Sequence, residues 1–184
     1  MLFLFIAIGI ITALLSWHFL VENKAKLDVK IPESKNLFYN DQQPIALTTA
    51  QIADEFEQYE GKPILLYLYT TWCNVCKKNF PVFNEIVREF QNTDLKIIAI
   101  AIDRDLTEEK LMSQLEPFGN IYFQPKYLAF KEGFGDFLKQ KNINYQGTIP
   151  FTALISKEGR IILKYVGVKR KNYLRNKIIE EVFN

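Results

Sequence analysis

Residues 71–81 read TWCNVCKKNFP and contain both cysteines of the chain, Cys73 and Cys76. They follow an apolar run, residues 63–69, that is too short for a helix and is typical of a buried central strand. The residues after the cysteines place apolar side chains at helical spacing up to residue 91. The sequence therefore predicts that the cysteines lie between the end of a strand and the first turn of a helix.

This position favours redox chemistry. Unpaired backbone N–H groups and the helix dipole stabilise a thiolate at a helix N-terminus, so Cys73 is the predicted nucleophile. Cys76 lies three residues further on and therefore on the same helix face. From there it can attack a mixed disulfide formed on Cys73 and release the substrate.

Inert structural cysteines and a metal site are the alternatives. A zinc site needs four ligands, and the sole histidine, His18, lies in an apolar N-terminal segment, where we interpret it as an interfacial residue. Copper(I) held by two thiolates has no supporting methionine cluster, since the chain has only two Met residues. We therefore expect neither a metal nor an organic cofactor.

The flanking sequence alternates between helical and strand patterns. A βαβα order predicts a mostly parallel sheet with right-handed crossovers, and a short turn at residues 157–159 adds an antiparallel hairpin. Pro81 is expected to kink its helix. Residues 116–144 give no clear pattern. The predicted elements are a helix from Thr48 or Thr49 to Gly61, strands at 63–69, 96–102, 151–156 and 160–166, and helices at 74–91, 107–115 and 169–183.

The N-terminal segment Met1–Val21 has no formally charged side chain and is about as long as a helix that crosses a bilayer. A cleavable signal peptide would have a basic start, a shorter apolar stretch and a small-x-small cleavage site, and none of these is clear. We interpret residues 1–21 as an uncleaved transmembrane anchor, residues 22–44 as a tether and residues 45–184 as one globular domain.

Charge indicates no nucleic-acid partner. The 184 residues include 23 Lys and Arg against 21 Asp and Glu, a formal net charge of +2. The one short basic cluster, residues 169–171, is interpreted as the solvated start of the last helix.

Residues 71–81 resemble the active-site segment of membrane-anchored thioredoxin-like proteins of the TlpA, ResA and DsbE type, including the proline at position 81. Residues 147–152, GTIPFT, resemble the cis-proline segment of that family, and residues 154–160 resemble the strand and hairpin that follow it. Gly167 falls where the family has a glycine after the last strand. The resemblance covers about residues 45–184.

The resemblance implies an α/β thioredoxin-like fold, a central mixed sheet flanked by helices, preceded by one N-terminal transmembrane helix. It implies that Pro150 is cis and packs against the cysteine pair, and that the backbone of Ile149 pairs with an extended substrate. Trp72 would shield Cys73 and contact the substrate; its alternative interpretation is a core aromatic.

Two residues depart from the family pattern. Asn79 occupies a position that is often acidic in the family, and Tyr67 stands where thioredoxins keep a buried acid. The proton acceptor for Cys76 is therefore open, with water, or Tyr67 as a hydrogen-bond donor, as candidates. Asp103 is a further candidate, but we interpret it as a solvated residue at a strand end.

We expect reversible dithiol–disulfide exchange with protein substrates that contain cysteines. The resemblance implies reduction of the substrate, and therefore an upstream thiol electron donor. The alternative is a non-catalytic thioredoxin-fold module that binds extended protein segments, which the missing carboxylates and the aromatic stretch 118–137 support.

Topology gives two conflicting indications. Lys24, Lys26 and Lys30 follow the predicted anchor and favour a cytoplasmic domain. The resemblance implies a single-pass protein of the cytoplasmic membrane with its domain on the periplasmic or extracytoplasmic side, where disulfides form. We expect the second arrangement.

Overall fold

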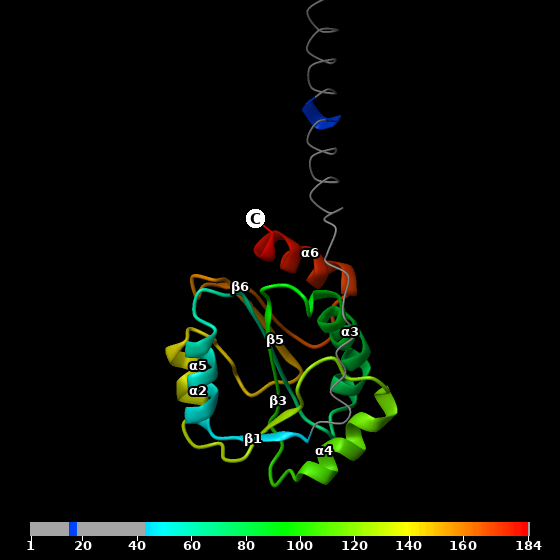
Figure 1. Ribbon diagram of the computed structural model, residues 1–184, viewed down its shortest axis with the longest axis vertical. Helices are drawn as coiled ribbons and strands as arrows, with labels where there is room; N and C mark the ends of the chain where they lie inside the picture. Colours follow the sequence, from blue (N-terminus) through cyan, green and yellow to red (C-terminus); the bar gives the residue numbers. More distant parts are fainter. Residues whose placement is uncertain (1–14, 18–42, 184) are drawn as a thin grey trace, which may run out of the picture.

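The computed structural model describes residues 15–17, which are helical, and residues 43–183 (Figure 1). The rest of the predicted anchor, nearly all of the tether and the lysines that bear on topology lie outside the described residues. Within the described ranges, no helix is long and apolar enough to cross a membrane.

Six strands form one mixed sheet in the order β1-β4-β3-β2-β5-β6. The first four in this order run parallel to one another, and β5 is antiparallel to both of its neighbours, β2 and β6. The mostly parallel sheet and the antiparallel β5–β6 hairpin are as the sequence predicts. All six residues of the central strand β2 are buried. The strands are β1 (Ile45–Leu47), β2 (Ile64–Tyr69), β3 (Lys96–Ala101), β4 (Lys126–Leu128), β5 (Phe151–Ile155) and β6 (Ile161–Val166).

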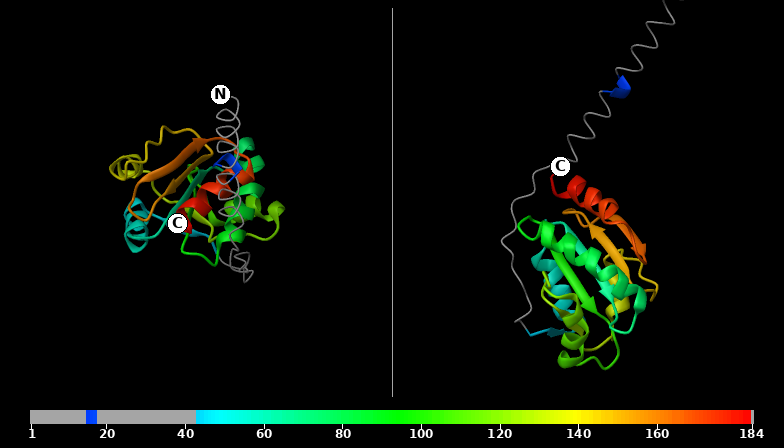
Figure 2. Two further views of the ribbon diagram at one scale, coloured as in Figure 1. Left: turned by 90° about the horizontal axis from the view of Figure 1, so that it is seen from above. Right: turned by 90° about the vertical axis from the view of Figure 1, so that its right-hand side faces the viewer.

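Helices cover both faces of the sheet (Figures 1 and 2). The pair α2 (Thr49–Gln58) and α5 (Phe134–Gln140) packs on one face, over the even-numbered residues of β2. Three helices pack over the odd-numbered residues on the other face: α3 (Asn74–Phe90), α4 (Glu108–Leu115) and α6 (Lys171–Val182). Strand β2 therefore lies between two hydrophobic cores, which explains its continuous apolar sequence.

Of the two predicted starts of the first helix, Thr48 and Thr49, Thr48 is the N-cap residue, and the predicted helix start at Thr107 is confirmed. Thr48 and Gln51 form a capping box at the start of α2, and the Thr107 side chain accepts a hydrogen bond from the Lys110 N–H at the start of α4. Helix α3 runs through Pro81 as one element, although proline cannot donate the usual helical hydrogen bond.

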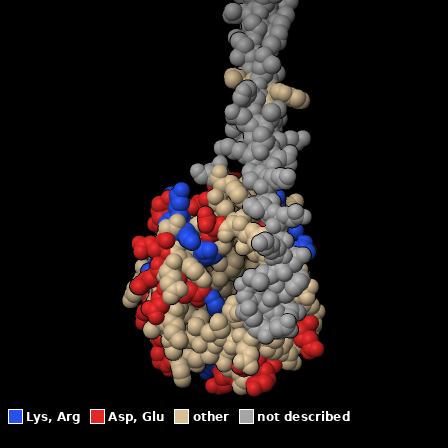
Figure 3. All heavy atoms as spheres, viewed as in Figure 1, with Lys and Arg blue, Asp and Glu red and all other residues tan. Residues whose placement is uncertain are grey.

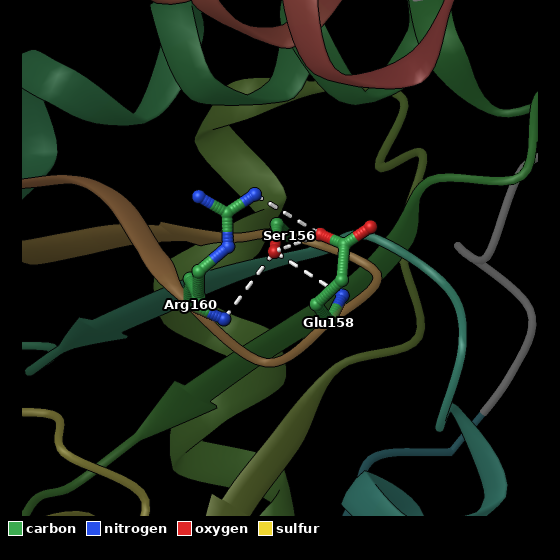
Figure 4. Close-up of polar contacts among 3 residues, drawn as sticks. All are labelled: Ser156, Glu158 and Arg160. Atoms are coloured by element: carbon green, nitrogen blue, oxygen red, sulfur yellow. Dashed lines mark hydrogen bonds and ion pairs between the residues drawn. The ribbon is translucent and has the colours of Figure 1, made fainter.

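The predicted hairpin joins β5 to β6 through a turn that Ser156 holds together (Figure 4). Its hydroxyl oxygen accepts hydrogen bonds from the backbone N–H groups of Glu158 and Arg160 and donates to a Glu158 carboxylate oxygen at 2.8 Å. Gly159 has φ of +77°, a left-handed conformation that favours glycine. This turn lies at the end of β5 opposite to Pro150.

Residues 116–144 contain elements that the sequence pattern did not reveal. They form a 3₁₀ turn (Glu116–Phe118), strand β4 and helix α5, and β1 lies at the start of the predicted domain, where no strand was predicted. Strands β1 and β4 have three residues each, too few for an alternating pattern to be recognised.

Candidate active site

The cysteines lie where β2 gives way to α3, as predicted. Cys73 is the N-cap residue of α3, and its sulfur accepts a hydrogen bond from the Cys76 N–H at 3.2 Å. A thiol thus occupies the place that a serine or aspartate side chain usually fills at a helix start. Both cysteines are free thiols. Both cysteines therefore lie at the first turn of α3, and thiol–disulfide exchange requires the two thiols to be close together in this way.

Cys76 is the more enclosed of the two thiols, with 2% of its surface exposed against 8% for Cys73. Burial, together with the neighbouring Cys73 side chain, raises the pKa of the Cys76 thiol from 9.0 to about 12. Cys76 is therefore a protonated thiol at neutral pH and needs a proton acceptor before it can act as a nucleophile.

Asp103 fixes the loop that leads to the cysteines. Its carboxylate accepts hydrogen bonds from the Thr71 N–H, at 3.0 and 3.1 Å to the two oxygens, and from the Thr71 hydroxyl at 2.5 Å. Only 4% of Asp103 is exposed, so its interpretation as a solvated residue was wrong. The parallel neighbours β2 and β3 end side by side, which brings these two residues together.

The loop that contains Ile149 and Pro150, called the proline loop below, has the predicted cis peptide bond. The Ile149–Pro150 bond is cis, and the Pro150 carbonyl accepts a hydrogen bond from the Gly167 N–H at 2.9 Å, which ties the loop to the end of β6. Ile149 is half-buried and packs against the core cluster that contains Cys73 and Cys76.

Trp72 is 69% exposed, which excludes its interpretation as a core aromatic. Trp72 and Ile149 line the same groove, which has a volume of about 540 Å³. The groove thus brings together Trp72 and Ile149, two of the three residues that the family resemblance assigned to the substrate site, although their contact with a substrate stays a prediction.

Two neutral residues fill the positions where the family often has acids. Tyr67 is fully buried, and its ring stacks on Phe83 with 4.3 Å between the ring centroids. Burial raises the pKa of Tyr67, and its hydroxyl group has no hydrogen-bond partner among the described residues. The phenol is therefore neutral and can donate a hydrogen bond, but it cannot act as a base.

A small cavity beside Cys76 was not predicted from the sequence. Its volume is about 20 Å³, enough for one water molecule. Tyr69 and Thr70 line it together with Cys76, and their hydroxyl groups are buried without a hydrogen-bond partner among the described residues. The Thr70-Thr71 pair before Trp72 is the sequence signal for hydroxyl groups here, while apolar side chains such as Phe80 and Leu111 form most of the remaining lining.

We predict that iodoacetamide modifies Cys73 but not Cys76 in the reduced, folded protein at pH 7. A rise in pKa from 9.0 to about 12 lowers the thiolate fraction of Cys76 on the order of 1,000-fold. Peptide mapping by mass spectrometry measures the labelling, and the urea-unfolded protein, in which both thiols react, is the control. In Cys73→Ser, where the burial remains, Cys76 should label only above about pH 10. Equal labelling of both cysteines would contradict the assignment.

We also predict that Asp103→Ala lowers the free energy of unfolding by about 2–3 kcal/mol, because it leaves the buried Thr71 N–H and hydroxyl without their charged acceptor. Urea unfolding gives the value. Asp103→Asn keeps one acceptor oxygen and should cost less. The control is Asp94→Ala, which removes an exposed carboxylate and should change stability by less than about 0.5 kcal/mol. Similar values for Asp94→Ala and Asp103→Ala would refute the anchoring role.

Known proteins resemble this chain in sequence and in fold. The thiol-disulfide oxidoreductase ResA of Bacillus cereus (strain ZK / E33L) is 27% identical over 120 residues, which are 65% of this chain and 64% of that protein. ResA of Bacillus thuringiensis (strain Al Hakam) is 29% identical over 122 residues, with the same coverage. The chain thus spans just under two thirds of the length of these relatives.

A solved structure has the same fold. The thiol:disulfide interchange protein of the thioredoxin family from Chlorobium tepidum TLS matches with a TM-score of 0.54 and 16% identity, over 68% of this chain and 83% of that one. The fold is therefore thioredoxin-like, and the resemblance to proteins of the TlpA, ResA and DsbE type is confirmed. Residues 44–175, most of the described domain, match the AhpC/TSA family model, and the chain belongs to the AhpC/TSA family.

Proposed function

We propose that the chain is a thiol:disulfide oxidoreductase that acts on protein substrates containing cysteines. The observation that carries this proposal is the position of Cys73 as the N-cap of α3, with its sulfur hydrogen-bonded by the Cys76 N–H. The names of the ResA relatives support the same activity.

The reaction transfers two electrons. The Cys73 thiolate attacks one sulfur of a substrate disulfide, forming a mixed disulfide and releasing the other substrate sulfur as a thiolate, which takes up a proton. Cys76 then loses its proton and attacks the Cys73 sulfur, which releases the second substrate thiolate. The substrate is reduced to a dithiol and the protein is oxidised to a Cys73–Cys76 disulfide, which an external dithiol donor reduces again.

Substrate would lie across Trp72 and the proline loop. The exposed ring of Trp72 and the half-buried Ile149 line one groove, and the Ile149 backbone precedes Pro150. An extended segment that paired with this backbone would have its disulfide beside Cys73, the more accessible thiol.

The proton of Cys76 leaves through the cavity beside it. Asp103 is engaged with Thr71, and Tyr67 is a neutral phenol, so neither is a free base. A water molecule held by the hydroxyl groups of Tyr69 and Thr70 would lie next to the Cys76 sulfur and could accept its proton.

The proposal also includes the direction of electron transfer and the side of the membrane on which the domain lies. The protein works as a reductant supplied by an upstream thiol donor, and residues 1–21 hold the domain at the extracytoplasmic side of the cytoplasmic membrane. The resemblance to ResA supports this arrangement, and the lysines after the anchor oppose it.

An insulin-reduction assay tests the activity. With dithiothreitol as donor, the protein should speed up insulin precipitation at least tenfold over dithiothreitol alone, because Cys73 and Cys76 act in sequence. Cys73→Ser should abolish the acceleration, and Cys76→Ser should accumulate mixed disulfides visible on a non-reducing gel. A protein that binds insulin without accelerating its reduction would be a binding module, and the proposal would fail.

The proton route predicts a slower second step in Thr70→Val and Tyr69→Phe. Each variant removes one hydroxyl group from the cavity, and the loss of one hydrogen bond corresponds to roughly a tenfold decrease in the rate at which the mixed disulfide resolves. Acid quenching during a single turnover measures this rate, and the decrease should shrink as the pH rises. Tyr127→Phe, in β4, is the matched control. Unchanged rates in both cavity variants would exclude this route.

A further inference from the structure

The groove lined by Trp72 and Ile149 extends well beyond these two residues. Its floor is formed by buried apolar side chains from three elements or their ends: Ile102 after β3, Leu128 in β4 and Phe134 in α5. The floor can therefore accept apolar side chains of a bound segment.

Three basic side chains also line this groove, and they come from three separate segments. Arg104 follows β3, Lys110 lies in α4 and Lys131 precedes α5, and all three are exposed. None of the three takes part in an ion pair between described residues. These three positive charges are therefore available to a ligand.

Among the described residues, a single carboxylate lines the groove, and it is not free to pair with these three cations. Asp103 is 4% exposed, and both of its oxygens accept hydrogen bonds from Thr71. The groove thus presents an apolar floor and a net positive lining. The face shown in Figure 3 carries interspersed acidic and basic side chains, so positive charge gathered in one groove is a local feature.

A second groove shows that this charge is not a general property of the surface. It has a volume of about 460 Å³ and lies at the other end of β5, near the β5–β6 turn. Three lysines and three glutamates line it, so its charges balance. Its residues are Lys62, Lys141, Lys157, Glu57, Glu60 and Glu158.

We propose that the groove lined by Trp72 and Ile149 selects cysteine-containing protein segments that carry acidic residues next to an apolar residue near the reactive disulfide. This inference rests on the proposed oxidoreductase function. The segment pairs with the backbone at Ile149, its apolar residue enters the groove, and its carboxylates meet Arg104, Lys110 and Lys131. Complementary charge of this kind raises the association rate and selects against basic partners.

Three synthetic peptides test the inference. Each has the same length and one intramolecular disulfide, and they differ only in three flanking positions, occupied by Glu, Gln or Lys. The reduced protein should react with the Glu peptide with a kcat/KM about tenfold higher than with the Gln peptide, and more slowly still with the Lys peptide. The preference should fall as ionic strength rises from 0.02 to about 0.5 M, because salt screens exposed charges.

Charge-reversal variants show where the preference resides. Lys110→Glu/Lys131→Glu should reverse the order of the Glu and Lys peptides, whereas Lys141→Glu/Lys157→Glu, in the second groove, should leave it unchanged. Circular dichroism checks that each variant folds. If the double variant does not fold, the single variant Lys131→Glu replaces it, and this variant should abolish most of the preference. A wild-type protein without charge preference, or a preference that survives in the first-groove variants, overturns the inference.

A neutral small disulfide separates this inference from the function on which it rests. Dipyridyl disulfide has no charge to be selected, so its reduction by the wild-type protein reports the chemistry of Cys73 and Cys76 alone. Reduction of dipyridyl disulfide without discrimination among the peptides would overturn the substrate class only. Failure to reduce any of these disulfides would overturn the proposed function itself.

Discussion

Strand β2 is buried on both faces, and the two hydrophobic cores meet along it. Its central position in the sheet fixes where its C-terminal end lies, and α3 must begin there to cover the odd-numbered residues of the strand. Cys73 is the N-cap residue of α3 and lies just after the C-terminal end of β2. The reactive sulfur is therefore placed by the core of the protein and not by a flexible loop.

The neighbouring strands bring the remaining parts of the site to the same edge. Parallel pairing of β2 with β3 sets Asp103 beside Thr71, and antiparallel pairing of β2 with β5 sets the proline loop opposite the start of α3. Residues more than 30 positions apart in the chain thus meet at one end of the sheet. Ligand sites in open α/β sheets occupy this same place, beyond the carboxyl ends of the parallel strands.

The sequence predicted the parts of this arrangement that have strong local signals. The position of the cysteines, the caps at Thr48 and Thr107 and the β5–β6 hairpin depend on neighbouring residues, and the structure confirms them. The cis bond before Pro150 was predicted from family resemblance alone. Asp103 was misjudged because its partner Thr71 lies 32 residues away, and position at a strand end does not show which loop covers it. Strand β1 pairs with β4, and β4 also pairs with β3, and no local sequence pattern records these pairings.

Neutral side chains where the family often has acids change the electrostatics of the second step. A buried carboxylate beside Cys76 would accept the thiol proton, but its negative charge would then raise the energy of a thiolate formed next to it. Tyr67 and Asn79 impose no such charge on a thiolate formed at Cys76. Without a carboxylate at these two positions, the proposed mechanism passes the proton to solvent or to a water molecule at the hydroxyl groups of Tyr69 and Thr70. In that mechanism, the rate at which the mixed disulfide resolves would depend on access of water to a cavity of about 20 Å³, and a substrate that closed this cavity would prolong its own mixed disulfide.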